Sequence, residues 1–592
     1  MRKRSEIDAS MKWDLTPIYP DAAAMETDLA DCGAMAEKIA ACAGTLSTKE
    51  GLAAALGLTF GAMEKLERAS CYAYLNYSLD GGNTAAQEMM AKTQNAGVTL
   101  MTAMSFMEPE MLTVPEEELK AWLDDPALAT YRHYVLDVIR AKAHTLDAKG
   151  EAILSQVAKI TGTASDTYDM FTDVEMEIPK IENENGEMVE LTSGNFGMYR
   201  ESSCRKVREN AFNTMFGTYK KYNNTFATLY AGNVKKDNML AAIRGYDSAC
   251  EAALFAGNVP VSVYDSLVGG VHEALPVMQK YLELRKKVLN LPELDVFDLY
   301  CPMTADVEYP MPFASGKELV KKALAPLGEE YAALLDRAFS ENWIDVYETP
   351  DKASGAYSMG IYGAHPYVLL NYTDTLDDAF TLAHELGHSM HSHYSNTTQD
   401  YVNHDYKIMV AEVASTVNEV LLTKYLLATE TDPARRAYVL NHFLEGFRTT
   451  VFRQTLFAEF ERKAHELESA GTPLTADCLN GIYAELEKTY YSAAKMQDVV
   501  AVEWSYIPHF YRAFYVYQYA TGFSSAVAIA SHILETGDTA GYLRFLTTGG
   551  SDYPLNELKI AGIDLTSPAV VENAMQVFAE TIDELAAVLV KE

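Results

Sequence analysis

The sequence predicts a mainly α fold, and three observations support this prediction. Ala, Leu, Met, Glu and Lys dominate most segments, and these residue types favour helices. Apolar residues recur at intervals of three and four, the spacing of one helix face, over most of the 592 residues. A hydrophobic fraction of 48% and a charged fraction of 22% are typical of a folded chain with a large core, which excludes disorder for its bulk.

The first 200 residues divide into two predicted regions. Residues 20–105 predict three or four amphipathic helices separated by glycine-containing turns. Acidic, proline-containing stretches within residues 108–117 indicate a boundary. We therefore expect a helical region over residues 1–110 and a second region, helical with a β-hairpin, over residues 111–200.

The predicted hairpin lies late in the second region. Residues 175–181 and 188–192 alternate apolar and polar side chains, which is typical of strands. Asn185-Gly186 stands between them, and both residue types tolerate the positive φ of a tight turn. A small antiparallel hairpin is therefore expected here.

The third predicted region covers residues 201–592. It begins with helical periodicity to about residue 340 and changes at residues 352–374, a Gly-, Ala-, Ser- and Tyr-rich loop that runs into a β-like segment at residues 367–372. Helical periodicity then continues to the end of the sequence, apart from a turn at residues 547–554.

The charge disfavours two classes of partner. There are 83 Asp and Glu residues against 48 Lys and Arg, a formal net charge of −35. Such a surface repels phosphate backbones and anionic lipid headgroups, so nucleic acids and membranes are not expected partners. The acidity itself is typical of a highly soluble protein.

The cysteines and the first residues predict a cytoplasmic protein. Seven cysteines are scattered without the dense, even-numbered pattern of a disulfide framework, which favours a reducing compartment. The sequence up to Trp13 is polar and lacks the apolar segment of a signal peptide. No run of about 18 apolar residues is present that could span a bilayer. The oligomeric state is not predicted.

The strongest chemical signal lies at residues 375–388. Thr375 and Asp378 resemble a capping box that starts a helix, and His384-Glu385-x-x-His388 follows on it. Side chains four apart share one helix face, so the two imidazoles can bind one metal ion, for which zinc is the prediction. The glutamate between them can act as base for a water on that ion. The alternative is a surface helix with solvated histidines.

A third ligand is expected from a carboxylate downstream. Glu412 is a charge among apolar neighbours on the next predicted helix, and a zinc ion is one partner that would stabilise it there. Ser415, Thr416 and Glu419 follow on the same face and could orient the ligands. The alternative for Glu412 is a charge favoured by the dipole at a helix N-terminus.

Two further histidines follow the motif. His391 lies on the ligand face, seven residues after His384, so that contact with a ligand or a substrate is expected of it. His393 lies off that face, which predicts a solvated side chain.

A tyrosine-rich segment at residues 504–522 could stabilise negative charge on a substrate carbonyl. His509, Tyr515 and Tyr519 are expected on one helix, and phenol or imidazole N–H groups are suitable donors to such an oxyanion. The alternative is an aromatic stripe that belongs to the core.

At this point the sequence resembles the M3 metallopeptidases, and within them the oligoendopeptidase F subfamily. The resemblance covers nearly the whole chain. It depends on six stretches: Trp13-Asp14-Leu15, the hairpin at Asn185-Gly186, Phe380 to His391, Ala411 to Glu419, Ile507 to Gly522, and Gly549 to Pro554.

The resemblance implies a zincin-type, neurolysin-like helical ellipsoid, split by a deep channel with the zinc site on its floor and a small β-sheet or hairpin near the active site. Residues 201–592 would be the catalytic domain. The 355–363 loop and residues 367–372 would line the channel, and the latter would offer an edge to an extended substrate. Short oligopeptides would fit this channel, whereas folded proteins would not.

The resemblance also implies a role for each motif residue. His384, His388 and Glu412 would hold one zinc ion per chain, and Glu385 would be the base. His509 and Tyr519 would contact the substrate or the oxyanion, with Tyr515 and Tyr517 as alternative donors. Substrate contacts are expected from Tyr367, Tyr372, Tyr517 and His391.

The predicted function is therefore a zinc-dependent endopeptidase that hydrolyses internal bonds of short unstructured oligopeptides, with zinc-bound water activated by a glutamate. One alternative is a carboxypeptidase or dipeptidyl carboxypeptidase, which would need a cation such as Arg512 for the free carboxylate. Another is a non-catalytic peptide-binding protein. Cobalt or manganese in place of zinc also stays open.

Overall fold

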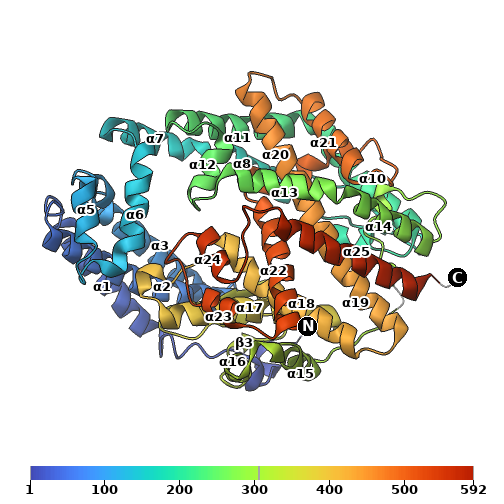
Figure 1. Ribbon diagram of the computed structural model, residues 1–592, viewed down its shortest axis with the longest axis horizontal. Coiled ribbons are helices and arrows are strands. Elements are labelled where there is room, and N and C mark those ends of the chain that lie inside the picture. Colours follow the sequence, from blue (N-terminus) through green and yellow to red (C-terminus); the bar gives the residue numbers. More distant parts are fainter. Residues whose placement is uncertain (1, 305–306, 591–592) are drawn as a thin grey trace. The chain divides into compact units, whose positions relative to one another are not determined.

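The computed structural model describes residues 2–304 and 307–590 and confirms the mainly α class (Figure 1). The chain forms two compact units, each built from three separate segments. Unit 1 holds residues 1–145, 309–425 and 529–563, and unit 2 holds residues 146–308, 426–528 and 564–592. In the part of the chain that the structure describes, no helix is long and apolar enough to cross a membrane.

Unit 1 contains helices from all three of its segments and a small sheet. Its helices are α1 (Ala22–Ala40), α2 (Lys49–Leu79), α3 (Thr84–Met104), α4 (Met107–Met111), α5 (Glu116–Trp122), α6 (Arg132–Ala141), α15 (Phe313–Ala323), α16 (Glu329–Ser340), α17 (Leu376–Thr398), α23 (Ala540–Leu546) and α24 (Pro554–Ile560). Its strands are β3 (Ile344–Asp345), β4 (Tyr357–Met359) and β5 (Tyr367–Leu369).

Unit 2 is helical apart from one hairpin. Its helices are α7 (Ala148–Thr161), α8 (Thr163–Met170), α9 (Phe196–Arg200), α10 (Arg205–Lys221), α11 (Asn223–Ile243), α12 (Ala249–Phe255), α13 (Val261–Glu273), α14 (Leu275–Val288), α19 (Pro433–Gly446), α20 (Arg453–Ser469), α21 (Ala476–Tyr490) and α25 (Ala569–Leu589). Its strands are β1 (Ile181–Glu182) and β2 (Met188–Val189). Two helices run through both units: α18 (Ile408–Thr429) and α22 (Tyr517–Thr536).

The first three helices of unit 1 confirm the prediction for residues 20–105. Each has a side-chain cap, from Asp21, Thr48 and Asn83 respectively, which satisfies backbone N–H groups that the first turn leaves without partners. The three helices pack against one another (Figure 1, blue). Their core joins that of α4–α6 in one apolar cluster, and a second cluster packs residues of α1 and α2 against Trp13 and β5.

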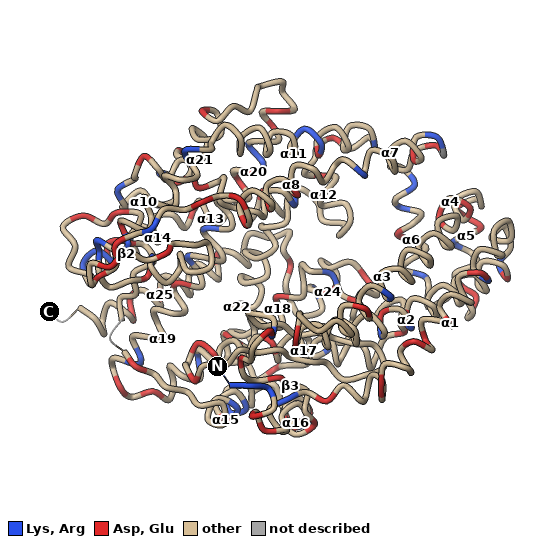
Figure 2. Tube along the Cα trace, turned by 180° about the vertical axis from the view of Figure 1, so that it is seen from behind, with Lys and Arg blue, Asp and Glu red and all other residues tan. Residues whose placement is uncertain are grey.

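The sheet of unit 1 is closed by the N-terminal segment. Arg4 donates to the buried carboxylate of Asp345 in β3, with N···O distances of 2.6 and 3.1 Å. Figure 2 shows the basic N-terminal residues beside β3. On the same carboxylate lies the buried ammonium of Lys352, at 2.8 Å. Trp13 then packs edge-on against Tyr367 of β5.

The order of the sheet corrects one prediction. Residues 367–372 were expected to offer an edge, and the strand β5 within them is instead the middle strand, parallel to β3 and antiparallel to β4. The prediction was wrong because β3, far away in sequence, covers the side that residues 367–369 alone leave open. The strand with one unpaired side next to α17 is β4.

In unit 2 the predicted hairpin is present but shorter than expected. Ile181 pairs with Val189, and Glu182 pairs with Met188, around a turn in which Gly186 has a φ of 79°. The first predicted strand, residues 175–181, is wrong over most of its length: residue 175 ends a π-helical turn, residues 176–180 are irregular, and pairing begins only at Ile181.

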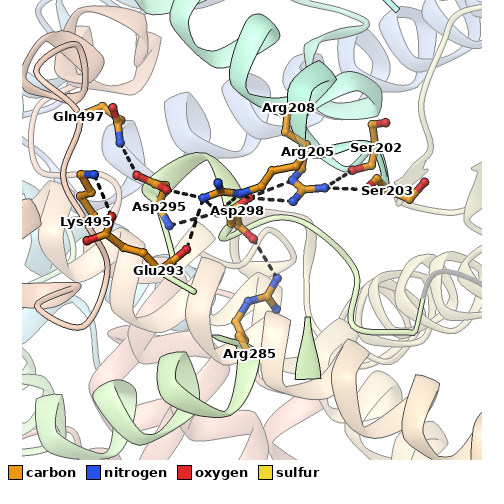
Figure 3. Close-up of polar contacts among 10 residues, drawn as sticks. All are labelled: Ser202, Ser203, Arg205, Arg208, Arg285, Glu293, Asp295, Asp298, Lys495 and Gln497. Carbon is orange, nitrogen blue, oxygen red and sulfur yellow. Dashed lines mark hydrogen bonds and ion pairs between the residues drawn. The ribbon is translucent and has the colours of Figure 1, made fainter. Parts of the chain in front are cut away.

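Unit 2 is also tied together by a buried ionic cluster (Figure 3). Asp298 is fully buried and accepts hydrogen bonds from Arg205 and Arg208 of α10, the closest at 2.8 and 2.7 Å. Its carboxylate also accepts from the backbone N–H of Asp295, at 3.1 Å. Arg208 is itself buried and donates to two backbone carbonyls. One carboxylate thus pairs with the buried guanidinium of Arg208, which has little access to water, and with the partly exposed guanidinium of Arg205.

Candidate metal centre

The helix that carries the predicted motif starts where the sequence indicates. Thr375 Oγ1 accepts from the N–H of Asp378 at 3.2 Å, and a carboxylate oxygen of Asp378 accepts from the N–H of Thr375 at 2.9 Å. This reciprocal capping box fixes the first turn of α17. From that start, His384 and His388 follow on one face of the helix.

Three donor atoms converge between α17 and α18. The Nε2 atoms of His384 and His388 lie 3.1 Å apart. Glu412 Oε2 of α18 lies 3.5 Å from the first and 3.7 Å from the second. A tetrahedral ion with bonds of about 2.0–2.1 Å holds its ligand atoms about 3.4 Å apart, so the three atoms fit a zinc ion. Among the described residues this is the group of His, Cys, Asp and Glu side chains placed to hold a metal.

The two histidines differ in protonation. His384 Nδ1 hydrogen-bonds to Glu419 Oε1, which directs Nε2 toward the other donor atoms. Burial alone would lower the pKa of His384, but the hydrogen bond and negative charge of Glu419 raise it to about 9, so without a metal the ring also carries a proton on Nε2, which a bound metal would displace. Burial lowers the pKa of His388 to about 3, so its ring is neutral. The carboxylates around His384 favour a positive charge at this point, which a metal ion would supply.

Glu385 lies beside these donors and is 7% exposed. Burial raises the pKa of its carboxyl to about 7, with further contributions from the negative charges of Glu412 and Glu419 and an opposing one from His384. The backbone N–H of Ser358 in β4 hydrogen-bonds to it. A carboxyl group with a pKa near neutrality is suited to accept and return a proton.

The expected orienting residues lie close to the ligands. Ser415 Oγ donates to Glu412 Oε2 at 3.2 Å. Thr416 is buried in the same helix. Asn418, which the sequence reasoning assigned no role, donates to the carbonyl of Ala383 at 3.0 Å and accepts from Tyr331 at 3.0 Å. It therefore ties α18 to α17 immediately before the first histidine. The sequence signal that could have identified Asn418 is a polar residue among apolar neighbours on a predicted helix.

Four residues expected to contact substrate are buried. Tyr367 is fully buried and donates to the backbone of Asp14, and Tyr372 donates to the backbone of Met311. Tyr517 is 3% exposed, and His391 is fully buried, with its ring stacked on Tyr406 at 3.7 Å. In these positions the four side chains are not accessible to a ligand, which argues against direct contact with a substrate. His393, expected in solvent, is half-buried near Trp343.

In unit 2, the tyrosine-rich segment is not one helix, which corrects the prediction for residues 509–519. His509 lies in a 3₁₀ turn, residues 508–511, and α22 begins at Tyr517. Phe514 between them has a φ of 53°, a left-handed conformation that a continuous helix excludes. The helical spacing of the tyrosines misled the prediction because Pro508 and the turn at Phe514 break the periodicity.

Three aromatic side chains of the tyrosine-rich segment nevertheless lie close together. Tyr519 Oη donates to Tyr515 Oη at 3.2 Å, and the ring of His509 lies 6.3 Å from that of Tyr515 and 6.2 Å from that of Tyr519. His509 is exposed, and both tyrosines are partly exposed. Arg512 lies 4.1 Å over the ring of Tyr515. The structure thus separates Tyr515 and Tyr519 from the buried Tyr517.

Comparison with known proteins identifies related chains over the full length. Residues 198–577 match Peptidase family M3, and residues 110–178 match Oligopeptidase F. These segments begin near residues 111 and 201, the predicted region boundaries, and the division into three regions stays a prediction. Oligopeptidase PepF of Bacillus subtilis (strain 168) is 41% identical over 593 residues, which cover 99% of this chain and 88% of that protein.

Solved structures agree with this. A crystal structure from Chlamydophila abortus has 33% identity and a TM-score of 0.92, covering 99% of this chain and 100% of that one. Oligoendopeptidase-F from Enterococcus faecium has 36% identity and a TM-score of 0.76, covering 95% and 98%. The chain therefore belongs to peptidase family M3, in its oligopeptidase F branch.

Proposed function

We propose that this M3 metalloendopeptidase is zinc-dependent and hydrolyses internal bonds of short, unstructured oligopeptides, with Glu385 as the base. The observation that carries the proposal is the position of a buried carboxyl group beside three donor atoms spaced for one metal ion. The name of the Bacillus relative, an oligopeptidase, supports the substrate class. The scattered free cysteines support a reducing compartment such as the cytoplasm.

One zinc ion per chain would be held by His384, His388 and Glu412. When bound, it would supply a Lewis acid for the scissile carbonyl and lower the pKa of a water molecule. Glu385 accepts a proton from the attacking water as the new C–O bond forms. It then returns that proton to the amine nitrogen as the C–N bond breaks. The carboxyl thus ends the cycle in the state in which it began.

Strand β4 would align the substrate. This strand has one unpaired side, and its Ser358 reaches the carboxyl of Glu385 through the backbone. An extended peptide can add to such an edge through main-chain hydrogen bonds, whatever its side chains. Recognition of this kind favours unfolded peptides and little sequence preference.

The proposed donors to the developing oxyanion are Tyr519 and Tyr515. Replacing Tyr519 or Tyr515 by Phe removes a partly exposed hydroxyl and is expected to lower kcat on the order of 10²-fold for the donor that acts, with little change in KM. Tyr517→Phe is the matched control, because that side chain is buried two residues away. Steady-state kinetics on a quenched peptide measures this, and equal losses in all three variants would refute the assignment.

Glu419→Gln tests the orientation of the first ligand. The amide cannot accept the His384 hydrogen bond as a carboxylate does, so we expect zinc affinity to fall about 10- to 100-fold. Competition with a chromogenic chelator measures the affinity. Glu430→Gln, a change at a partly exposed residue beyond the end of α18, is the control and should leave the affinity as it is.

The function itself is tested by mass spectrometry of a mixed peptide set of about 5 to 30 residues, with free or blocked termini. Internal cleavage of blocked short peptides, lost with chelator and in Glu385→Gln, is the expected result. Cleavage that needs a free C-terminus would replace the proposal by an exopeptidase. Peptide binding without any cleavage by the metal-loaded protein would replace it by a binding protein.

A further inference from the structure

A cavity of about 630 Å³ opens in unit 1 between α16, the last turns of α17 and the end of α23. This volume lies within the usual range of small-molecule sites. None of the residues of the candidate metal centre lines it. The lining residues are Glu330, Ala333, Leu334, Arg337, His393, Tyr394, Thr397, Thr398, Leu543, Arg544 and Thr547.

The cavity is lined by exposed charged side chains of both signs, Glu330, Arg337 and Arg544. Arg544 has no carboxylate partner among the described residues, although the chain carries a net charge of −35. Arg337 uses Nε and Nη2 for Glu341, at 3.0 and 3.2 Å, and its Nη1 has no hydrogen-bond partner among the described residues. Glu330 has no cation partner in the part of the chain that the structure describes. The site can therefore accept an anion and a cation together.

A buried hydroxyl adds a second, independent indication of a ligand. Tyr394 is 8% exposed, and its Oη is buried with no hydrogen-bond partner among the described residues. Burial, with the charge of Glu330, raises the pKa of Tyr394 to about 12, so the hydroxyl keeps its proton. A buried polar atom without a partner costs free energy that a hydrogen-bonding ligand would recover. The side chains of Ala333, Leu334 and Leu543 supply apolar surface beside it.

We propose that this cavity binds a short peptide with free termini and apolar side chains. Its carboxylate is recognised by Arg544 and the free edge of Arg337, for which planar guanidinium groups are suited. Its ammonium group is recognised by Glu330, and its side chains lie against Leu334 and Leu543. Peptides with blocked termini lack the terminal charges that Arg544, Arg337 and Glu330 would bind.

The cavity adjoins the helix that carries the metal ligands. His393 and Tyr394 follow His388 by about one and a half turns of α17. Phe545, next to Arg544 in α23, packs on the buried ring of His391 at 5.3 Å. The proposed endopeptidase would release short peptides with free termini, so the ligand of the cavity would be its product. This identification of the ligand as a product depends on the proposed function, whereas the binding of such a peptide does not.

Calorimetric titration of Leu-Leu into the metal-loaded, full-length Glu385→Gln protein tests the proposal, with a saturating blocked nonapeptide present to occupy the metal centre. We expect one Leu-Leu per chain. Arg544→Gln and the C-terminal amide of Leu-Leu should each bind at least tenfold more weakly, as should Glu330→Gln and N-acetyl-Leu-Leu. Tyr394→Phe should weaken binding severalfold.

Arg132→Gln, an exposed arginine of unit 1 outside the cavity, is the matched control and should bind as the parent does. Absence of binding, or equal binding by the Arg544 and Glu330 variants, would overturn the proposal. Binding that appears only without the nonapeptide would also overturn it, since Leu-Leu would then occupy the metal centre. If the nonapeptide itself fails to bind, the proposed function is wrong. The affinities of the cavity variants for Leu-Leu still test the cavity proposal in that case.

Discussion

Replacing Glu385 by Gln is expected to lower kcat for a blocked oligopeptide by about 10²- to 10⁴-fold, the range typical of a lost general base. The amide has the same size as the carboxylate and lies in the same 7% exposed position, so the fold should not change. It cannot accept a proton from water. The loss should therefore appear in kcat, while KM for the peptide changes little.

The measurement pairs kinetics with metal content. Zinc per chain, determined by mass spectrometry of the metal, should be unchanged in Glu385→Gln, because its side chain is not among the three donors. Asp377→Asn, an exposed carboxylate in the first turn of the same helix, is the control. Parent-like activity in Glu385→Gln would exclude this residue as the base.

Replacing Asp298 by Asn is expected to lower the free energy of unfolding by about 3–5 kcal/mol, the cost of breaking a buried ion pair from one side. The neutral side chain leaves the buried guanidinium of Arg208 without its counter-charge. It also leaves Arg205 with only Asp295.

Glu293→Gln is the matched control within the same cluster (Figure 3). Glu293 pairs with Lys495 at 2.8 Å, but both side chains are more than half exposed, so about 0–1 kcal/mol is expected. Denaturant unfolding followed by circular dichroism measures both variants. A loss of stability in Asp298→Asn no larger than that of the control would show that the cluster does not hold unit 2 together.

Features set by local spacing could be predicted from the sequence. The capping box at Thr375 and the histidine pair that follows depend on residues within one helix, and α1–α3 depend on periodicity and caps that lie next to each other along the chain. Glu412 could be found because a single acid in an apolar stretch needs a partner. In the first two cases the contacting residues are close together in the sequence. In the third, a charged residue in an apolar stretch has few possible partners.

What could not be predicted depends on segments distant in sequence. That β5 is a middle strand follows from its pairing with β3, and the role of Ser358 follows from the approach of β4 to α17. The break at Phe514 is a backbone state that the helical spacing of the tyrosines conceals. Burial of Tyr367 and His391 is likewise set by residues that pack over them, such as Trp13 and Tyr406.

The pairing of Arg4 with Asp345 has a consequence for how the protein is made. The two residues are separated by 341 positions, so at a synthesis rate of about 5–20 residues per second the N-terminal segment waits on the order of 20–70 s for the strand that it covers. During that interval α1–α3 can already pack from local contacts, whereas the side of Trp13 that contacts Tyr367 of β5 stays uncovered on the ribosome. Chaperones that hold nascent chains can bind this surface until β5 is made.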